Sequence, residues 1–163
     1  MIALPAPRRA RGFSLIELLA AAVILGILAT VAVPVIETTM RREREQQLRV
    51  ALRDIRQAID AYKRAVDAGR IEVAADDSGY PPTLTDLVAG VPDKQAGHGR
   101  QLVFLRRIPR DPFEADRSVT AIDSWGKRSY RSTAAAPAAG DDVFDVYSKS
   151  AQKGLNGVPY REW

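Results

Sequence analysis

The feature that most constrains this chain is a long apolar run near its start. From Leu18 to Ile36 there are 19 consecutive residues without a formal charge, close to the roughly 20 that a helix needs to cross a hydrocarbon core of about 30 Å. A secretory signal has a shorter apolar region, about 7 to 15 residues, followed by a small-x-small cleavage site. No such site closes this run, so it predicts a membrane-spanning helix. One carboxylate, Glu17, immediately precedes it and has no nearby basic residue on its C-terminal side.

Charge and composition exclude some partners. The 163 residues carry a formal charge of +4, but Arg8, Arg9 and Arg11 lie in the first dozen residues, and without these three the charge falls from +4 to +1. That balance gives no electrostatic footprint for nucleic acid, and none is expected as a partner. The chain has no cysteine, so disulfides cannot hold its fold.

A second helical pattern follows the apolar run. Apolar residues recur at spacings of three and four, as expected for one face of an amphipathic helix: Leu48, Leu52, Ile55, Ile59, Tyr62 and Val66. Gly69 supplies the expected helix end. A continuous helix from Phe13 to Ala68 would be roughly 84 Å long. Gly26 and Pro34 weaken it, either as interruptions that membrane helices tolerate or as the bounds of a functional weak segment.

The remaining residues predict a small mixed domain. Tyr80-Pro81-Pro82 is extended, and Thr83 to Asp86 resembles a capping box before a short helix through Val88. Two strands are expected at Arg128–Ser132 and Val143–Ser150. The predicted fold class is therefore α+β, and an ordered loop is expected over the last dozen residues, 152–163.

The sequence offers few candidate catalytic residues. The lone His98 stands between two glycines and is expected in solvent. A Gly-rich phosphate loop and a metal-type histidine cluster are both missing from the sequence. We therefore expect no catalytic residues and no enzyme activity.

The start of the chain resembles a known processing site. Gly12-Phe13-Ser14-Leu15-Ile16-Glu17, preceded by Arg11 and followed by the apolar run, is similar to the site at which type IV pilins and type II secretion pseudopilins are cut. The resemblance implies cleavage after Gly12 by a prepilin peptidase, which then N-methylates Phe13. It also implies a cytoplasmic leader and a periplasmic C-terminal domain on a single-pass inner-membrane protein.

The same resemblance gives the unexplained acid a role. A lone carboxylate beside hydrocarbon is costly and by default marks a function. In filaments of this family the partner is implied to be the N-terminal amine of a neighbouring subunit, here that of Phe13. Glu17 would then favour assembly, because the charge pair forms only between chains.

Later motifs resemble those of major pseudopilins, as follows: Tyr80–Leu87, Leu105–Phe113, Asp123–Tyr130 and Phe144–Ser148. About ten residues, Glu114–Ile122, separate two of these motifs, as if a loop had been inserted or the motif duplicated. Major pseudopilins commonly hold calcium with aspartates in the loop after the final strand. Here Ser148–Gly157 has two lysines and no carboxylate, whereas calcium favours anionic oxygens. Calcium is therefore disfavoured and no metal or other cofactor is expected.

Together these features identify the chain as resembling a type II secretion pseudopilin with a type IV pilin-like fold, a long N-terminal helix packed on a small antiparallel sheet. The expected parts are a leader (1–12), a transmembrane or filament-core helix (13–36), an amphipathic half (37–68) and a periplasmic domain (69–163). Expected partners are the prepilin peptidase and methyltransferase, lipid before assembly, an inner-membrane assembly platform, and copies of itself and other pseudopilins in a helical periplasmic filament.

Two alternatives remain open. A type IV pilin or minor pilin would act in adhesion, motility or DNA uptake, although many of those close a C-terminal loop with a disulfide. A membrane-anchored periplasmic enzyme or binding protein would have no reason to place Gly12, Phe13 and Glu17 in this register.

Overall fold

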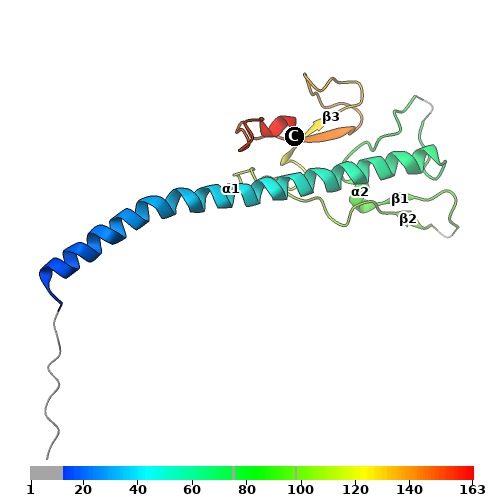
Figure 1. Cartoon of the computed structure of the whole chain (residues 1–163). Helices are drawn as coiled ribbons and strands as arrows, with labels where there is room; N and C mark the ends of the chain where they lie inside the picture. Colours follow the sequence, from blue (N-terminus) through cyan, green and yellow to red (C-terminus); the bar gives the residue numbers. More distant parts are fainter. Residues whose placement is uncertain (1–12, 75, 98) are drawn as a thin grey trace, which may run out of the picture. The chain divides into compact units, whose positions relative to one another are not determined.

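The computed structural model describes residues 13–74, 76–97 and 99–163, without the side chains of 30–34. Its elements in chain order are α1 (Leu15–Asp67), α2 (Asp86–Ala89), β1 (Val91–Pro92), β2 (Gln101–Leu102), β3 (Trp125–Arg128), β4 (Asp145–Ser148) and the 3₁₀ helix η1 (Tyr160–Glu162) (Figure 1). Contacts divide the chain into two units, Met1–Arg41 and Arg42–Trp163, and α1 runs through both. The architecture is α+β with small antiparallel sheets, as predicted.

Helix α1 has well-defined ends. At its start, the amides of Glu17 and Leu18 donate to the carbonyl of Ser14 at 3.1 and 3.2 Å. At its end Gly69 adopts a φ of +69°, and the amides of Gly69 and Arg70 donate to the carbonyls three and five residues back. This arrangement is a Schellman motif, which glycine favours because it lacks a Cβ. Helix α1 therefore ends at Asp67, one residue before the helix end expected from the sequence.

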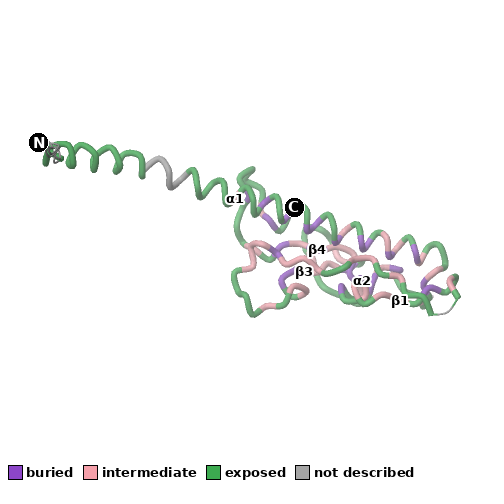
Figure 2. Tube along the Cα trace, turned by 90° about the horizontal axis from the view of Figure 1, so that it is seen from below, coloured by how far each residue is buried: buried purple, intermediate pink, exposed green. Residues whose placement is uncertain are grey.

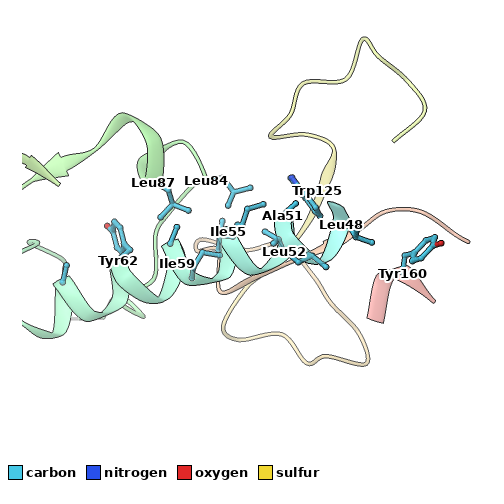
Figure 3. Packing of buried hydrophobic residues seen from close by; sticks show 14 of the residues in the cluster. Leu48, Ala51, Leu52, Ile55, Ile59, Tyr62, Leu84, Leu87, Trp125 and Tyr160 are labelled. Carbon is cyan, nitrogen blue, oxygen red and sulfur yellow. The ribbon is translucent and has the colours of Figure 1, made fainter. Parts of the chain in front are cut away.

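The core of the second unit lies on the predicted stripe of α1. Figure 2 shows the buried residues of α1 on the face that the rest of this unit covers. Five of the six predicted positions are buried and Val66 is partly buried: Leu48, Leu52, Ile55, Ile59 and Tyr62. Leu84 and Leu87 point toward this stripe from the segment around α2 (Figure 3). Burial of these side chains contributes about 1.5–3 kcal/mol each.

The turn before α2 follows the predicted capping box in part. One oxygen of Asp86 accepts hydrogen bonds from the amide and hydroxyl of Thr83, at 2.9 and 2.8 Å. The N-cap residue itself, Thr85, makes no side-chain cap bond, so one half of the reciprocal pair is present. The helix ends at Ala89, one residue beyond the prediction, and β1 and β2 then pair antiparallel.

The predicted pair of later strands exists, but the first was misplaced. Strand β3 pairs antiparallel with β4, with Trp125 opposite Ser148 and Arg128 opposite Asp145. The strand predicted at 128–132 is wrong beyond Arg128, because those residues form a turn. The amide of Ser132 donates to the carbonyl of Ser129 at 3.1 Å, which takes this segment out of the ladder. Strand β4 lies inside its predicted range.

The last dozen residues are ordered, as expected. Lys153 and Pro159 form an isolated bridge, and Tyr160 in η1 is fully buried. Its ring stacks on that of Phe113, with centroids 4.1 Å apart. The final turn therefore joins the core of the second unit.

Candidate functional site

The N-terminal part of α1 is an exposed apolar surface. Every residue whose side chain is described from 13 to 40 is exposed. We call its large apolar members the apolar helix surface: Phe13, Leu15, Ile16, Leu18, Leu19, Val23, Ile24, Leu25, Ile27, Leu28, Val35, Ile36 and Met40. Exposed apolar surface of this extent marks a site that contacts lipid or other protein.

Part of the predicted N-terminal machinery falls outside the described residues. The leader 1–12, including the cleavage residue Gly12, is not described, nor is His98. Within the part of the chain that is described, no helical segment is both long and apolar enough to span a bilayer. Five residues of the expected span, 30–34, have no described side chains.

Glu17 lies in the first turn of α1, four residues after Phe13, and both side chains are exposed. None of the ion pairs found among the described residues involves Glu17. A carboxylate in this turn interacts favourably with the helix dipole, by about 0.3–1 kcal/mol at an exposed site. That interaction leaves its charge accessible to a partner outside the chain.

The two helix-weakening positions lie inside continuous helix. A Cβ added at Gly26 would meet nothing within 4 Å, so packing does not explain this glycine. Pro34 is also within α1, although its side chain lies outside the described set. Beyond it, the hydroxyls of Thr38 and Thr39 donate to the carbonyl of Val35 at 3.0 and 2.8 Å.

A network of hydrogen bonds and ion pairs centred on Glu45 connects α1 to the C-terminal segment. This side chain is buried, with 4% of the residue exposed. One carboxylate oxygen accepts from the amide of Leu155 at 2.7 Å and from the hydroxyl of Tyr160 at 2.9 Å. The other lies 3.9 Å from the guanidinium of Arg49. A buried carboxylate needs such donors to offset its lost hydration.

Arg56, three turns after Glu45 on α1, extends this network. Its guanidinium donates to a carboxylate oxygen of Asp145 at 2.7 Å and to the backbone oxygen of Trp163 at 2.7 Å. Arg128 donates to the second oxygen of Asp145 at 3.2 Å. The guanidinium of Arg49 also lies 4.4 Å from the ring centroid of Trp163. The composition gave no sign of this network, because its members are far apart in sequence.

The loop after β4 has an unsuitable donor set for calcium. It contributes Lys149 and Lys153 and no carboxylate. The ammonium of Lys149 donates to the backbone oxygen of Asp123 at 2.7 Å. Among the described residues, no group of three or more acidic, histidine or cysteine side chains could hold a metal ion. The residues of this loop therefore do not fit the calcium site that the resemblance to major pseudopilins implies. The expected lack of a metal stays a prediction.

The segment Glu114–Ile122, which separates two of the motifs, is held by hydrogen bonds on two sides. The guanidinium of Arg110 donates to the backbone oxygens of Asp116 and Val119. Lys149 holds the next residue, Asp123. This segment is thus an ordered part of the domain surface.

Two buried carboxyl groups have shifted acidities of opposite sign. Burial raises the pKa of Asp111, whose hydrogen bonds, including one from the Ser148 side chain and one from the Phe113 amide, oppose that shift only in part. The Arg70 guanidinium beside Asp93 lowers the pKa of that carboxyl. Perturbed acidity can mark catalysis, but here each shift has a structural cause, which is burial for Asp111 and the ion pair with Arg70 for Asp93.

A hollow beside α1 has no hydroxyl, thiol or amine nucleophile among its lining residues. It has a volume of about 1000 Å³ and lies between α1 and the segment 107–112. Its lining contains acidic, arginine, amide and apolar side chains, with no histidine, serine, threonine, cysteine or lysine. Of the side chains that act as covalent nucleophiles in enzymes, only carboxylates line this hollow, and no histidine or lysine base stands beside them.

Comparison with known proteins finds a family match at the N-terminal region of the chain. A family model described as the prokaryotic N-terminal methylation motif matches residues 7–33, the region that contains Phe13 and Glu17. Comparison with the solved structures finds no match.

Three curated relatives carry the same name, type II secretion system core protein G. That of Klebsiella pneumoniae is 31% identical over 124 residues, covering 74% of this chain and 81% of that protein. That of Vibrio cholerae serotype O1 is 30% identical over 112 residues, covering 67% and 69%. That of Dickeya chrysanthemi is 29% identical over 125 residues, covering 74% of each. These relatives are structural components of a secretion system and indicate no enzyme family. At this identity and coverage, the chain belongs to the family of the type II secretion system core protein G.

Proposed function

We propose that this chain is a pseudopilin, a structural subunit that polymerises into a periplasmic filament and thereby drives protein export across the outer membrane. The observation that carries the proposal is the apolar helix surface, which is exposed over every described side chain from 13 to 40. The second unit has its own buried core, formed by residues between Leu48 and Tyr160. The chain therefore pairs a self-sufficient domain with a helix that needs an external apolar environment.

Two environments would satisfy this helix in turn. Before assembly, lipid would surround it in the inner membrane, with the C-terminal domain in the periplasm. After cleavage between Gly12 and Phe13 and N-methylation of Phe13 by a prepilin peptidase and methyltransferase, neighbouring subunits would replace the lipid. An assembly platform in the inner membrane would add the subunits one at a time.

Glu17 would supply the charge contact of this assembly. Its exposed carboxylate would pair with the N-terminal amine of Phe13 on a neighbouring subunit. Pairing in an apolar surrounding compensates two charges that would each be costly alone. The relatives' shared name favours a secretion filament over a type IV pilus.

The experiment is Glu17→Ala in the full chain, with Glu37→Ala as the matched control, because Glu37 is an exposed acid on the same helix. Membrane fractionation should recover both variants as well as the wild type. Sheared filaments and secreted protein should fall at least about tenfold for Glu17→Ala only, since one buried charge pair is worth a few kcal/mol. Normal filaments from Glu17→Ala would refute the role of the carboxylate.

A further inference from the structure

We propose that the C-terminal loop, residues 149–157, is held in place by the chain's own side chains instead of by a calcium ion, so that the fold of this subunit is independent of calcium. The proposal concerns the family's metal and goes beyond filament assembly. Three contacts of the loop and its flanks carry it.

In the first contact, a positively charged side chain of the loop binds a backbone carbonyl oxygen. The ammonium of Lys149 lies 2.7 Å from the backbone oxygen of Asp123. Carbonyl oxygens are calcium ligands, and here a lysine occupies one. A divalent ion in this loop would also be repelled by Lys149 and Lys153 without any loop carboxylate to offset the repulsion.

The second contact replaces a loop carboxylate by one from α1. Glu45 receives the amide of Leu155, at the tip of the loop, and the hydroxyl of Tyr160, just beyond it. The negative charge that orders the loop therefore comes from the helix and acts through direct hydrogen bonds. Hydrogen bonds to a buried charged group are among the stronger ones in proteins.

The third contact closes the loop against an aromatic ring. A Cβ added at Gly154 would lie 3.2 Å from Cε2 of Trp163 and 2.6 Å from Oδ1 of Asn156, so both side chains pack on this glycine. The amide of Gly154 donates to the carbonyl of Val158 at 2.7 Å. Trp163 is in turn held by Arg56. The loop is thus fastened at both ends and at its tip.

The test is thermal unfolding of the purified full chain in detergent, followed by near-ultraviolet circular dichroism, with excess chelator or with millimolar calcium chloride. The expected midpoint is the same in both, to within about 1 °C, because a ligand that does not bind the folded state does not stabilise it. A rise of more than about 4 °C with calcium would overturn the proposal. The measurement is independent of filament assembly, so failure of the proposed function leaves it valid.

Substitutions then identify the groups that replace the ion. Glu45→Ala should lower the midpoint by about 8 °C, because it leaves two donors unpaired, and calcium should not restore it. Glu43→Ala, an exposed acid two residues earlier, should change it by less than about 2 °C.

Lys149→Met is the milder second variant, for use if Glu45→Ala does not fold. It should lower the midpoint by about 2–4 °C and speed amide hydrogen exchange across 149–157. Its control is Lys94→Met, which removes an exposed ion pair to Glu72. Equal behaviour of Lys149→Met and Lys94→Met would contradict the role of the Lys149 ammonium.

Discussion

Gly126 is the position where a single added methyl group should reveal the packing of the β3–β4 pair. It lies directly opposite Tyr147 in the antiparallel ladder. A Cβ added there would fall inside van der Waals contact with Cε2 and Cζ of Tyr147 and 2.8 Å from its Cδ2. The tyrosine ring therefore covers the glycine, and Gly126→Ala must displace either the ring or the strand.

The expected cost follows from this overlap. Overpacking of this kind costs about 1–3 kcal/mol. For a folded unit of about 120 residues, each kcal/mol shifts the melting midpoint by about 4 °C, so the loss should be about 4–12 °C. The assay is thermal unfolding of the full chain in detergent. Gly97→Ala is the matched control, because a Cβ there meets nothing within 4 Å.

A double-mutant cycle separates the clash from other effects of alanine. In a Tyr147→Ala background the added methyl group at Gly126 has room, so Gly126→Ala should cost less than about 0.5 kcal/mol. An equal loss in both backgrounds would refute the argument. A wild-type midpoint for Gly126→Ala would refute it as well.

Three further predictions concern the acidity of two carboxyl groups and the N-terminal helix. Burial raises the pKa of Asp111 in the folded state. The stability that this group contributes is therefore fully present at low pH and is lost as the pH rises through the folded pKa. Denaturant titrations should therefore show that Asp111→Asn gains stability relative to wild type as the pH rises above the ordinary pKa of an aspartate. Arg70 lowers the pKa of Asp93, so the stability that Asp93 contributes is present above its unfolded pKa and is lost as the pH falls through its folded pKa. Asp93→Asn should therefore approach the stability of the wild type in acid. Parallel pH profiles for the two variants would contradict both assignments. Gly26→Ala should stabilise the exposed helix by about 0.5–1 kcal/mol, and reduced filament yield with normal membrane insertion would support a weak segment there, whereas unchanged yield would contradict it.

Local patterns in the sequence predicted much of this fold. The stripe from Leu48 to Val66 fixed which face of α1 is buried, and Gly69 ended the helix through backbone conformation alone. Both features depend on residues within a few positions of one another. Strand β4 was predicted for the same reason, since it lies inside its expected range.

Features that depend on distant residues were beyond sequence reasoning. The start of β3 was misplaced because Gly126 gives no local strand signal, and only the Tyr147 ring across the ladder explains the glycine. The bond between Arg56 and Asp145 joins positions 89 residues apart. The role of Glu17 in assembly remains a prediction, since its partner would lie on another chain.

Glu17 and Glu45 are both acids beside an apolar pattern on one helix. One signal did distinguish Glu45: it stands three residues before Leu48, in step with the buried stripe. Its charge is met within the chain by Leu155 and Tyr160, whereas none of the ion pairs among the described residues involves Glu17. An acid whose donors lie in the same chain should govern the stability of the subunit. An acid whose donor lies on a neighbouring chain should govern assembly and leave that stability unchanged, because the unassembled chain already keeps its carboxylate exposed. The two substitutions to alanine should therefore separate folding from assembly along a single helix.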